Sequence, residues 1–316
     1  MKKGSKVVVI GGGTGIYSLL SGLKKYPIKI SAIISMADDG GSTGILREEF
    51  NILPPGDVRQ ALLALSSNQE ALCDLFNYRF DKGKIKGHNF GNLFLTALYK
   101  INKNNFKKAV ESASEILSIK GEVIPVTLER SRLCAVLENK KTIIGETNID
   151  IPKHNGNLKI EKIYLNPAVR INKKAKEAIL EADFIVLGPG DLYTSILPNL
   201  LVKGVAEAIG KNRARKVYVC NLMTKFGETN NFKGEDFLGE IEKYLAGKID
   251  YVILNNKKPL AQKCLRYRKK RAYPVEYNKE VLKKKQIKII ESNFLKKGKF
   301  IWHDPEKIAK IVYSLK

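Results

Sequence analysis

Three turns rich in glycine, hydroxyl and carboxylate groups carry the side chains of this sequence that could do chemistry. The first turn follows the apolar run 7–10 and precedes a helical pattern of Tyr17, Leu20 and Leu23. It consists of Gly11, Gly12, Gly13, Thr14 and Gly15. A strand, a glycine-rich turn and a helix in this order direct backbone N–H groups and a positive helix end at an anion. Without a Cβ, glycine lets phosphate oxygens approach the backbone. The turn therefore predicts a phosphate cradle, with a merely tight turn as the alternative.

This turn lacks the defining residues of two familiar phosphate motifs. No Gly-Lys-Ser/Thr follows it, so it is not a Walker A motif, and Ile16 occupies the third glycine position of GxGxxG. The nucleotide class therefore stays open.

The second turn closes the predicted strand 28–35 and contains two adjacent carboxylates. Its residues are Ala37, Asp38, Asp39, Gly40, Gly41, Ser42, Thr43 and Gly44. A carboxylate at the end of the second strand of a dinucleotide fold accepts hydrogen bonds from a ribose. Two carboxylates beside a phosphate can equally hold Mg²⁺. Asp38 and Asp39 therefore predict a ribose contact or a magnesium site, and a solvated turn is the third possibility. No other metal or cofactor is expected.

The third turn follows the apolar run 184–187 and again begins a predicted helix. Its residues are Gly188, Pro189, Gly190, Asp191, Leu192, Tyr193, Thr194 and Ser195. Asn221 and Thr224 follow the next predicted strand at the same sheet edge. Two such turns face each other where the strand order of a parallel sheet reverses. Together they predict a site for a phosphorylated ligand, most simply a nucleotide.

A polar segment at 87–92 begins an apolar helix over 93–99. Asn92 is a candidate ligand residue, although Asn89 or Asn92 can instead simply cap the helix. His88 could serve as an acid or base, but a lone histidine is more often structural, and no HxxxH or HxH metal spacing accompanies it. No nucleophile and base occur at a recognisable spacing, so catalytic residues stay unassigned.

Short β-branched runs alternate with amphipathic helices along the chain. This alternation predicts an α/β, Rossmann-like, doubly wound and mostly parallel sheet in one domain, 1–316. Buried strands are expected at 6–10, 28–35, 183–187, 216–220 and 250–254. Within 122–165 four short strands predict an antiparallel β insertion, its first strand at 123–128. Asp57 is expected to cap the helix that contains Val58 and Leu62. Asp304 is expected to cap a last helix, with Pro305 in its first position.

The 316 residues carry a formal net charge of +24, and 257–316 forms a basic C-terminal part with 19 basic and 5 acidic residues. Such a surface suits a nucleotide, a membrane or nucleic acid. The excess of lysine over arginine disfavours specific nucleic-acid recognition, so nucleic acid is not expected as the main partner. The four cysteines form no CxxC pair, and no apolar stretch suits a leader or a membrane span. A cytoplasmic protein without a membrane span is expected, and a homo-oligomer is left open.

The motifs taken together resemble the gluconeogenesis factor family. The segments that carry the resemblance are 11–15, 37–44, Leu53-Pro54-Pro55-Gly56-Asp57-Val58-Arg59, Gly91-Asn92-Leu93-Phe94, 188–199, 217–224 and His303-Asp304-Pro305. They occur in order over nearly the whole chain. The family is related to the 2-phospho-L-lactate transferases and shares their Rossmann-like fold.

The resemblance implies a cytoplasmic bacterial protein needed for cell shape and wall integrity during gluconeogenic growth. It also implies binding of UDP-sugars such as UDP-N-acetylglucosamine, with no established reaction. By motif position Thr14 would meet the diphosphate, Asp38 and Asp39 would line the site, and Tyr267 would approach the ligand. In one departure, Trp302 stands where the family commonly has a basic residue, so a neighbouring side chain must supply that charge or binding is weaker.

Three functions therefore compete. A UDP-sugar-binding regulatory protein without turnover is favoured over a 2-phospho-L-lactate transferase-like enzyme that uses Mg²⁺ at Asp38 and Asp39. The third function is a nucleic-acid binder that uses the basic C-terminal part, and NAD remains a possible nucleotide ligand because Asp38 is placed for a ribose. Fold relationship alone does not license the transferase activity.

Overall fold

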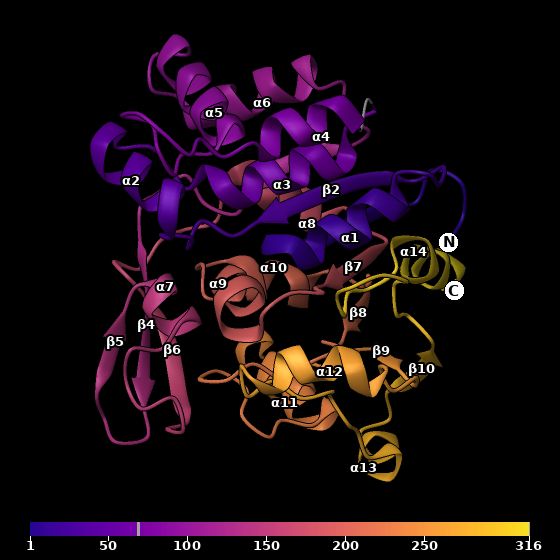
Figure 1. The fold of residues 1–316 in the computed structure, drawn as a ribbon. Helices are drawn as coiled ribbons and strands as arrows, with labels where there is room; N and C mark the ends of the chain where they lie inside the picture. Colours follow the sequence, from indigo (N-terminus) through magenta and orange to yellow (C-terminus); the bar gives the residue numbers. More distant parts are fainter. Residues whose placement is uncertain (68–69, 316) are drawn as a thin grey trace.

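The computed structural model describes residues 1–67 and 70–315, so residue 316 of the basic C-terminal part lies outside it. A seven-stranded parallel sheet in the order β10-β9-β8-β7-β1-β2-β3 forms the centre, with helices on both faces (Figure 1). The predicted Rossmann-like α/β class is confirmed. The strands of this sheet are β1 (Lys6–Gly11), β2 (Lys29–Ile34), β3 (Glu122–Pro125), β7 (Phe184–Leu187), β8 (Arg215–Val219), β9 (Tyr251–Asn255) and β10 (Lys288–Ser292).

The five predicted buried strands are all present, within two residues of the expected bounds. Each is a run of β-branched and apolar residues because helices cover both of its faces. In β1, for example, Val7 to Ile10 are at most 1% exposed, and Val9 pairs with Ala32 of β2 on one side and Val186 of β7 on the other.

The strand order reverses at β1. The chain runs from β1 to β2 and β3 in one direction, and from β7 to β8, β9 and β10 in the other. Since crossovers between parallel strands are right-handed, the two halves place their helices on opposite faces of the sheet. The helices are α1 (Gly13–Leu23), α2 (Gly41–Phe50), α3 (Pro55–Leu65), α4 (Glu70–Asn77), α5 (Phe90–Ile101), α6 (Phe106–Ile116), α7 (Glu146–Asp150), α8 (Lys173–Leu180), the π-helix η1 (Leu192–Ile196), α9 (Leu197–Leu200), α10 (Val205–Lys211), α11 (Gly234–Leu245), α12 (Ala261–Arg268), α13 (Lys279–Lys284) and α14 (Pro305–Ser314).

The antiparallel insertion is smaller than its predicted range of 122–165. Its three strands are β4 (Arg132–Leu137), β5 (Thr142–Ile144) and β6 (Ile160–Asn166), in the order β5-β4-β6 (Figure 1). The segment 123–128 was wrongly included, because β3 instead extends the large sheet in parallel with β2, where Val123 and Ile124 are buried. Apolar runs alone do not reveal which sheet a short strand joins.

Helix starts were predicted with mixed success. Asn89 caps α5 by accepting a hydrogen bond from the Asn92 N–H, and Asp304 caps α14 with Pro305 in its first turn, as expected. Asp57 does not cap α3: the cap position is Pro54, and Asp57 lies inside the first helical turn. Its carboxylate is thereby free to face the first glycine turn.

Within the described residues, no helix combines the length and apolar character that crossing a membrane requires.

Candidate functional site

A cavity of about 450 Å³ opens at the carboxyl ends of β1, β7 and β8, where the strand order reverses. Its volume lies within the usual range of ligand pockets, about 300–1,000 Å³. Ten of the predicted site residues line it: Gly12, Gly13, Thr14, Gly15, Pro189, Gly190, Asp191, Ser195, Asn221 and Tyr267. The first and third turns therefore meet as the sequence predicted.

The first turn presents the start of α1 to this cavity. Gly12 occupies the cap position, and no side chain caps the helix there. The first amides of a helix have no partner within it, so those at Thr14 and Gly15 are available to an anion. Thr14 is exposed and lines the cavity. This is the geometry of a phosphate cradle.

The third turn packs directly against the first. A Cβ placed on Gly15 would lie 2.3 Å from the carbonyl oxygen of Pro189. The Asn221 side chain donates a hydrogen bond to the Gly190 carbonyl oxygen at 2.8 Å, which joins the β8 end to this turn. Gly11 and Gly188, the first glycines of the two turns, lie behind the cavity wall, and Gly188 takes a positive φ of 76°.

The second turn lies next to the cavity but does not form its wall. Asp39 accepts hydrogen bonds from the Thr147 N–H at 2.9 Å and the Glu146 N–H at 3.2 Å, and so anchors the start of α7. Asp38 accepts a hydrogen bond from the Gly40 N–H at 3.0 Å. Both carboxylates have protein partners, and their ribose and magnesium roles stay hypotheses.

Asp57 places its carboxylate against the first turn. Its Oδ2 lies 2.3 Å from where a Cβ of Gly12 would stand, and the Gly13 N–H hydrogen-bonds to the carboxylate. Burial, reinforced by the negative charge of Asp38, raises the pKa of Asp57 to about 7. Burial and the charges of Asp38 and Asp150 raise the pKa of Glu146 to about 9. Near pH 7, Glu146 and a large fraction of Asp57 therefore remain protonated, whereas ordinary carboxyl groups would be ionised.

A lysine occupies the nearby cluster of acidic groups that is best arranged for a cation. Oxygens of Asp150, Asp191 and Glu228 lie within 4.8 Å of one another. The Lys225 ammonium contacts all three, with Nζ 2.7 Å from Asp191 Oδ2 and 3.1 Å from Glu228 Oε1. Burial opposes the charge of Lys225, but the three carboxylates outweigh it and raise its pKa. A lysine thus fills the place of a metal ion here.

The remaining predicted residues stabilise the surroundings of the cavity. The Tyr193 N–H and the Thr194 hydroxyl each donate to the Glu228 carboxylate at 3.3 Å, and Thr224 exchanges hydrogen bonds with the Tyr273 backbone. Ser42 and Asn92 are buried in a hydrogen-bonded group with His88, whose Nδ1 lies 3.1 Å from the Ser42 hydroxyl.

The C-terminal part closes the cavity with a hairpin over 295–303, whose strands join through the bridge between Leu295 and His303. The Tyr267 hydroxyl, on α12, accepts a hydrogen bond from the Ile301 N–H at 2.9 Å. His303 Nε2 donates to the Cys220 carbonyl oxygen at 3.2 Å, and burial lowers the pKa of His303 to about 4, so its ring is neutral at pH 7. Lys296 and Trp302 complete this wall.

Sequence reasoning missed several residues that line the cavity: Tyr17, Ser18, Gln60, Asn77, Lys296 and Ile301. Lys296 had a usable signal, because it lies in the same short segment as Trp302 and could replace the basic residue that Trp302 displaces. Gln60 and Asn77 had none, since they reach the cavity only through the packing of α3 and α4.

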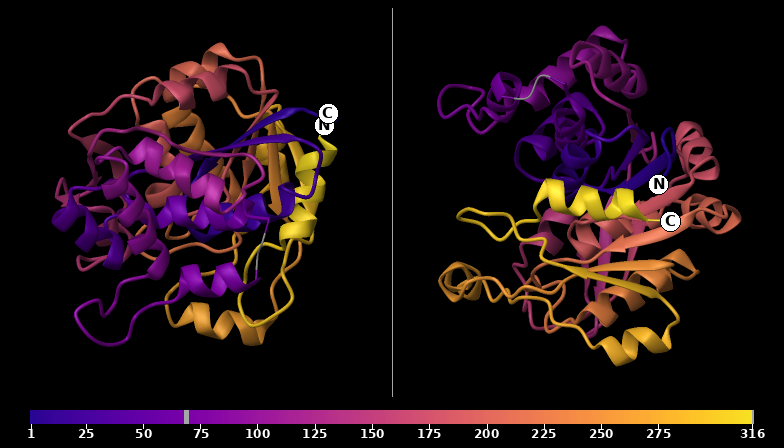
Figure 2. Two further views of the ribbon diagram at one scale, coloured as in Figure 1. Left: turned by 90° about the horizontal axis from the view of Figure 1, so that it is seen from above. Right: turned by 90° about the vertical axis from the view of Figure 1, so that its right-hand side faces the viewer.

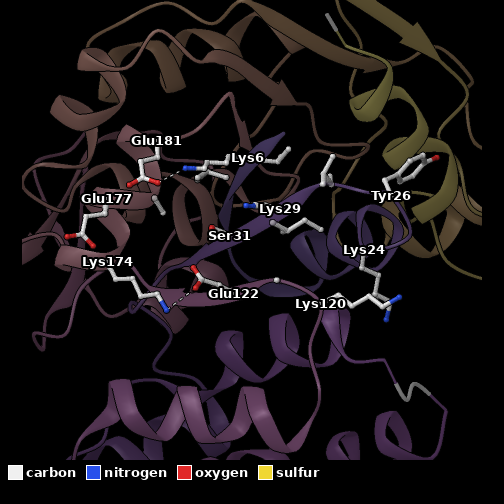
Figure 3. A pocket seen from close by; sticks show the side chains of 16 residues that line it. Lys6, Lys24, Tyr26, Lys29, Ser31, Lys120, Glu122, Lys174, Glu177 and Glu181 are labelled. Carbon is white, nitrogen blue, oxygen red and sulfur yellow. Dashed lines mark hydrogen bonds and ion pairs between the residues drawn. The ribbon is translucent and has the colours of Figure 1, made fainter. Parts of the chain in front are cut away.

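A second hollow, of about 580 Å³, lies at the opposite edge of the sheet, around the amino ends of β1, β2 and β3 (Figure 3). Two ion pairs form among its charged side chains, Lys6 with Glu181 at 2.7 Å and Lys174 with Glu122 at 3.1 Å. Its other lining lysines, Lys24, Lys29 and Lys120, leave this hollow with an excess of positive charge. None of the three predicted turns reaches it. We therefore place the candidate functional site at the carboxyl edge, although that cavity is smaller.

Comparison with known proteins shows the family to which the chain belongs. The family model described as 2-phospho-L-lactate transferase CofD matches residues 7–295. The chain belongs to the CofD family. It is 40% identical over 316 residues to a gluconeogenesis factor of Halalkalibacterium halodurans, covering 99% of this chain and 96% of the relative. It is 38% identical to the gluconeogenesis factor of Bacillus subtilis, covering 98% of each chain.

A solved structure gives the same answer for the fold. A member of the UPF0052 family from Bacillus halodurans superposes with a TM-score of 0.94 at 38% identity, over 99% of this chain and 100% of that one. The resemblance to gluconeogenesis factors noted in the sequence is thereby confirmed.

Proposed function

We propose that this CofD-family protein binds a UDP-sugar, such as UDP-N-acetylglucosamine, in the 450 Å³ cavity and acts as a regulatory protein of cell shape and wall integrity during gluconeogenic growth. The observation that carries the ligand proposal is that the first turn of α1, with Gly13, Thr14 and Gly15, lines the cavity and has no side-chain cap from its cap residue Gly12. The cytoplasm is the compartment we propose, on the ground of the family resemblance.

Lys296 is our candidate for the missing positive charge. It lines the cavity next to Trp302, with Nζ 5.9 Å from the centre of the indole ring. A diphosphate at the start of α1 would carry two negative charges, and an ammonium at the cavity wall favours such a ligand. The sequence departure at Trp302 is then compensated within the same hairpin.

Binding without turnover is the second part of the proposal. His303 is neutral and fixed to a backbone carbonyl, and His88 is buried outside the cavity lining. Among the described residues that line the cavity, no nucleophile stands against a base in the manner of a catalytic pair. We expect no release of UDP or free sugar. Release in proportion to protein concentration, lost in Asp38→Asn, would favour the transferase-like alternative.

A thermal-shift experiment tests the ligand. Ligands that bind only the native state raise its melting temperature. We expect a larger rise with UDP-N-acetylglucosamine than with NAD, and we expect Thr14→Val to abolish the difference. Lys296→Gln should reduce the rise with UDP-N-acetylglucosamine, whereas Lys310→Gln, an equal charge change on the exposed face of α14, should not. Equal shifts with both nucleotides would contradict a UDP-sugar preference.

A further inference from the structure

The hairpin 295–303 and helix α12 form a surface that carries positive charge without compensating negative charge. Residues 257–275 and 293–303 contain eleven lysines and arginines and neither aspartate nor glutamate. Among the described residues, Lys258 alone of these eleven forms an ion pair, with Glu276 at 3.2 Å. We call this surface, from α12 and the hairpin, the basic tip. Its partner must be strongly negative.

The two parts of the basic tip form one body. The Tyr267 hydroxyl accepts the Ile301 N–H, and Cys264 of α12 packs with Leu222 and Ile301. Figure 2 shows the hairpin and α12 projecting from the same side of the molecule. Charges on both therefore face one partner at the same time.

Large apolar side chains are exposed among these charges. Leu260 is 69% exposed, Leu265 55%, Trp302 46% and Phe300 39%. A groove of about 220 Å³ runs between Leu260 and Phe300, with Lys263 and Lys297 at its rim. Apolar side chains surrounded by lysines are typical of a surface that enters the headgroup layer of a membrane, where tryptophan is enriched and lysine stems extend along the boundary.

The arrangement of the rings decides between a membrane and single-stranded nucleic acid. Phe300 and Trp302 are stacked, with centroids 5.0 Å apart and planes 12° from parallel. The Arg266 guanidinium lies over Phe300 at 4.9 Å, and the Lys296 ammonium lies over Trp302 at 5.9 Å. Nucleobases bind to open ring faces. The faces of the Phe300 and Trp302 rings already contact each other, Arg266 and Lys296, so mainly the ring edges are available to a partner.

We propose that the basic tip binds the surface of an anionic phospholipid bilayer, with Phe300 and Trp302 in the headgroup layer and lysines against the lipid phosphates. The attachment is peripheral and electrostatic, and it weakens as salt rises. The proposal does not depend on the identity of the ligand in the cavity.

Trp302 is the only tryptophan of the chain, so in the absence of a cavity ligand its fluorescence reports on contacts of the hairpin 295–303. We expect vesicles of phosphatidylcholine with about 30% phosphatidylglycerol to shift the Trp302 emission to shorter wavelength. Vesicles that contain brominated phosphatidylglycerol should quench this emission. Vesicles of pure phosphatidylcholine should do neither. No shift and no quenching with the anionic vesicles would overturn the proposal.

Vesicle sedimentation with variants locates the contact. Each lysine near an anionic surface contributes about fivefold in partitioning, so Lys297→Gln with Lys299→Gln should weaken binding on the order of twentyfold. Lys84→Gln with Lys86→Gln makes the same charge change in an exposed loop elsewhere and should have little effect. Equal losses in both double variants would contradict a localised site.

Phe300→Ser tests the apolar part of the surface, and we expect on the order of a tenfold loss with all charges kept. A labelled single-stranded oligonucleotide serves as the competing partner. If the oligonucleotide binds more tightly than the anionic vesicles at the same salt, and the Lys297 and Lys299 changes abolish that binding, the basic tip is a nucleic-acid surface and the membrane proposal is wrong.

Discussion

Gly15 of the first turn and Pro189 of the third turn are in direct backbone contact. A Cβ on Gly15 would stand 2.3 Å from the Pro189 carbonyl oxygen and 2.6 Å from its carbonyl carbon. The two turns that line the cavity can approach this closely only because Gly15 has no side chain. The shape of the cavity therefore depends on Gly15 having only a hydrogen atom as its side chain.

Gly15→Ala should therefore separate the two turns. We expect a loss of about 1–3 kcal/mol in unfolding free energy, the usual effect of overpacking, together with weaker UDP-sugar binding. Gly210→Ala is the matched control, because a Cβ at Gly210 in α10 would meet nothing within 4 Å. That change should be neutral or should stabilise by up to about 1 kcal/mol, since alanine favours helix. Urea unfolding of both variants provides the comparison, and similar values would contradict the close contact.

The raised pKa of Asp57, about 7, should make folding stability fall with rising pH. Because this pKa is above the ordinary value, the native state holds a proton that the unfolded state has released, and stability decreases from about pH 4 to about pH 7. Glu146, with a pKa of about 9, extends the decrease to higher pH. Asp57→Asn should reduce the slope below pH 7, where Glu146 still contributes, and should leave the slope between pH 7 and 9. Unfolding measured across this range would contradict the assignment if the variant and the parent were parallel.

The same proton should affect ligand binding. An ionised Asp57 beside the phosphate cradle repels a diphosphate, so affinity for UDP-N-acetylglucosamine should fall as pH rises through 7. Asp57→Asn removes this charge while keeping an acceptor for the Gly13 N–H, and its affinity should vary little between about pH 6 and pH 8. Titration calorimetry at three pH values would settle the point, and a parent affinity independent of pH would count against it.

Lys225 should be critical for stability, because its ammonium neutralises three carboxylates, including the fully buried Glu228 side chain. Removing one partner of a buried charge pair costs about 3–5 kcal/mol. We expect Lys225→Met to reach that range in denaturant unfolding. Adding Glu228→Gln removes the orphaned charge and should restore part of the loss. A double variant as unstable as the sum of the two single variants would contradict the pairing.

Tyr267 has a structural contact that the sequence did not reveal, and two variants separate it from ligand binding. Tyr267→Phe removes only the hydrogen bond to the Ile301 N–H and should retain UDP-sugar affinity if the ring packs beside the nucleotide. Tyr267→Ala should lose about 1–3 kcal/mol, the scale of one base–aromatic stack. Lys269→Gln with Lys270→Gln should change affinity little, since exposed charges contribute at most about 1 kcal/mol. If Tyr267→Ala binds like the parent, the ring does not contact the ligand.

The strands of the sheet, and the first and third turns, could be predicted because each is specified by residues within one short segment. Val7 to Ile10 and the glycines after them specify a buried strand and its turn within one short segment. Glu122–Pro125 was assigned to the wrong sheet because strand partnership depends on the crossover through α2 to α6. Asp57 was mistaken for a cap because its true role depends on where Gly12 and Gly13 of another segment come to lie.

Asp39 illustrates the same limit at the second turn. An Asp-Asp pair after a strand suggests a ribose or a metal, yet its oxygens accept the first amides of α7, more than a hundred residues further along the chain. No spacing rule reaches that far. Residue type predicted a hydrogen-bonding carboxylate, and only the fold identifies its partner.

Trp302 borders the cavity on one side and stands in the basic tip on the other. Two binding events that share a side chain are thermodynamically linked: by whatever factor a cavity ligand changes affinity for the bilayer, the bilayer changes affinity for that ligand. Through the hairpin, the concentration of the nucleotide-sugar would then set the fraction of the protein that is attached to a membrane.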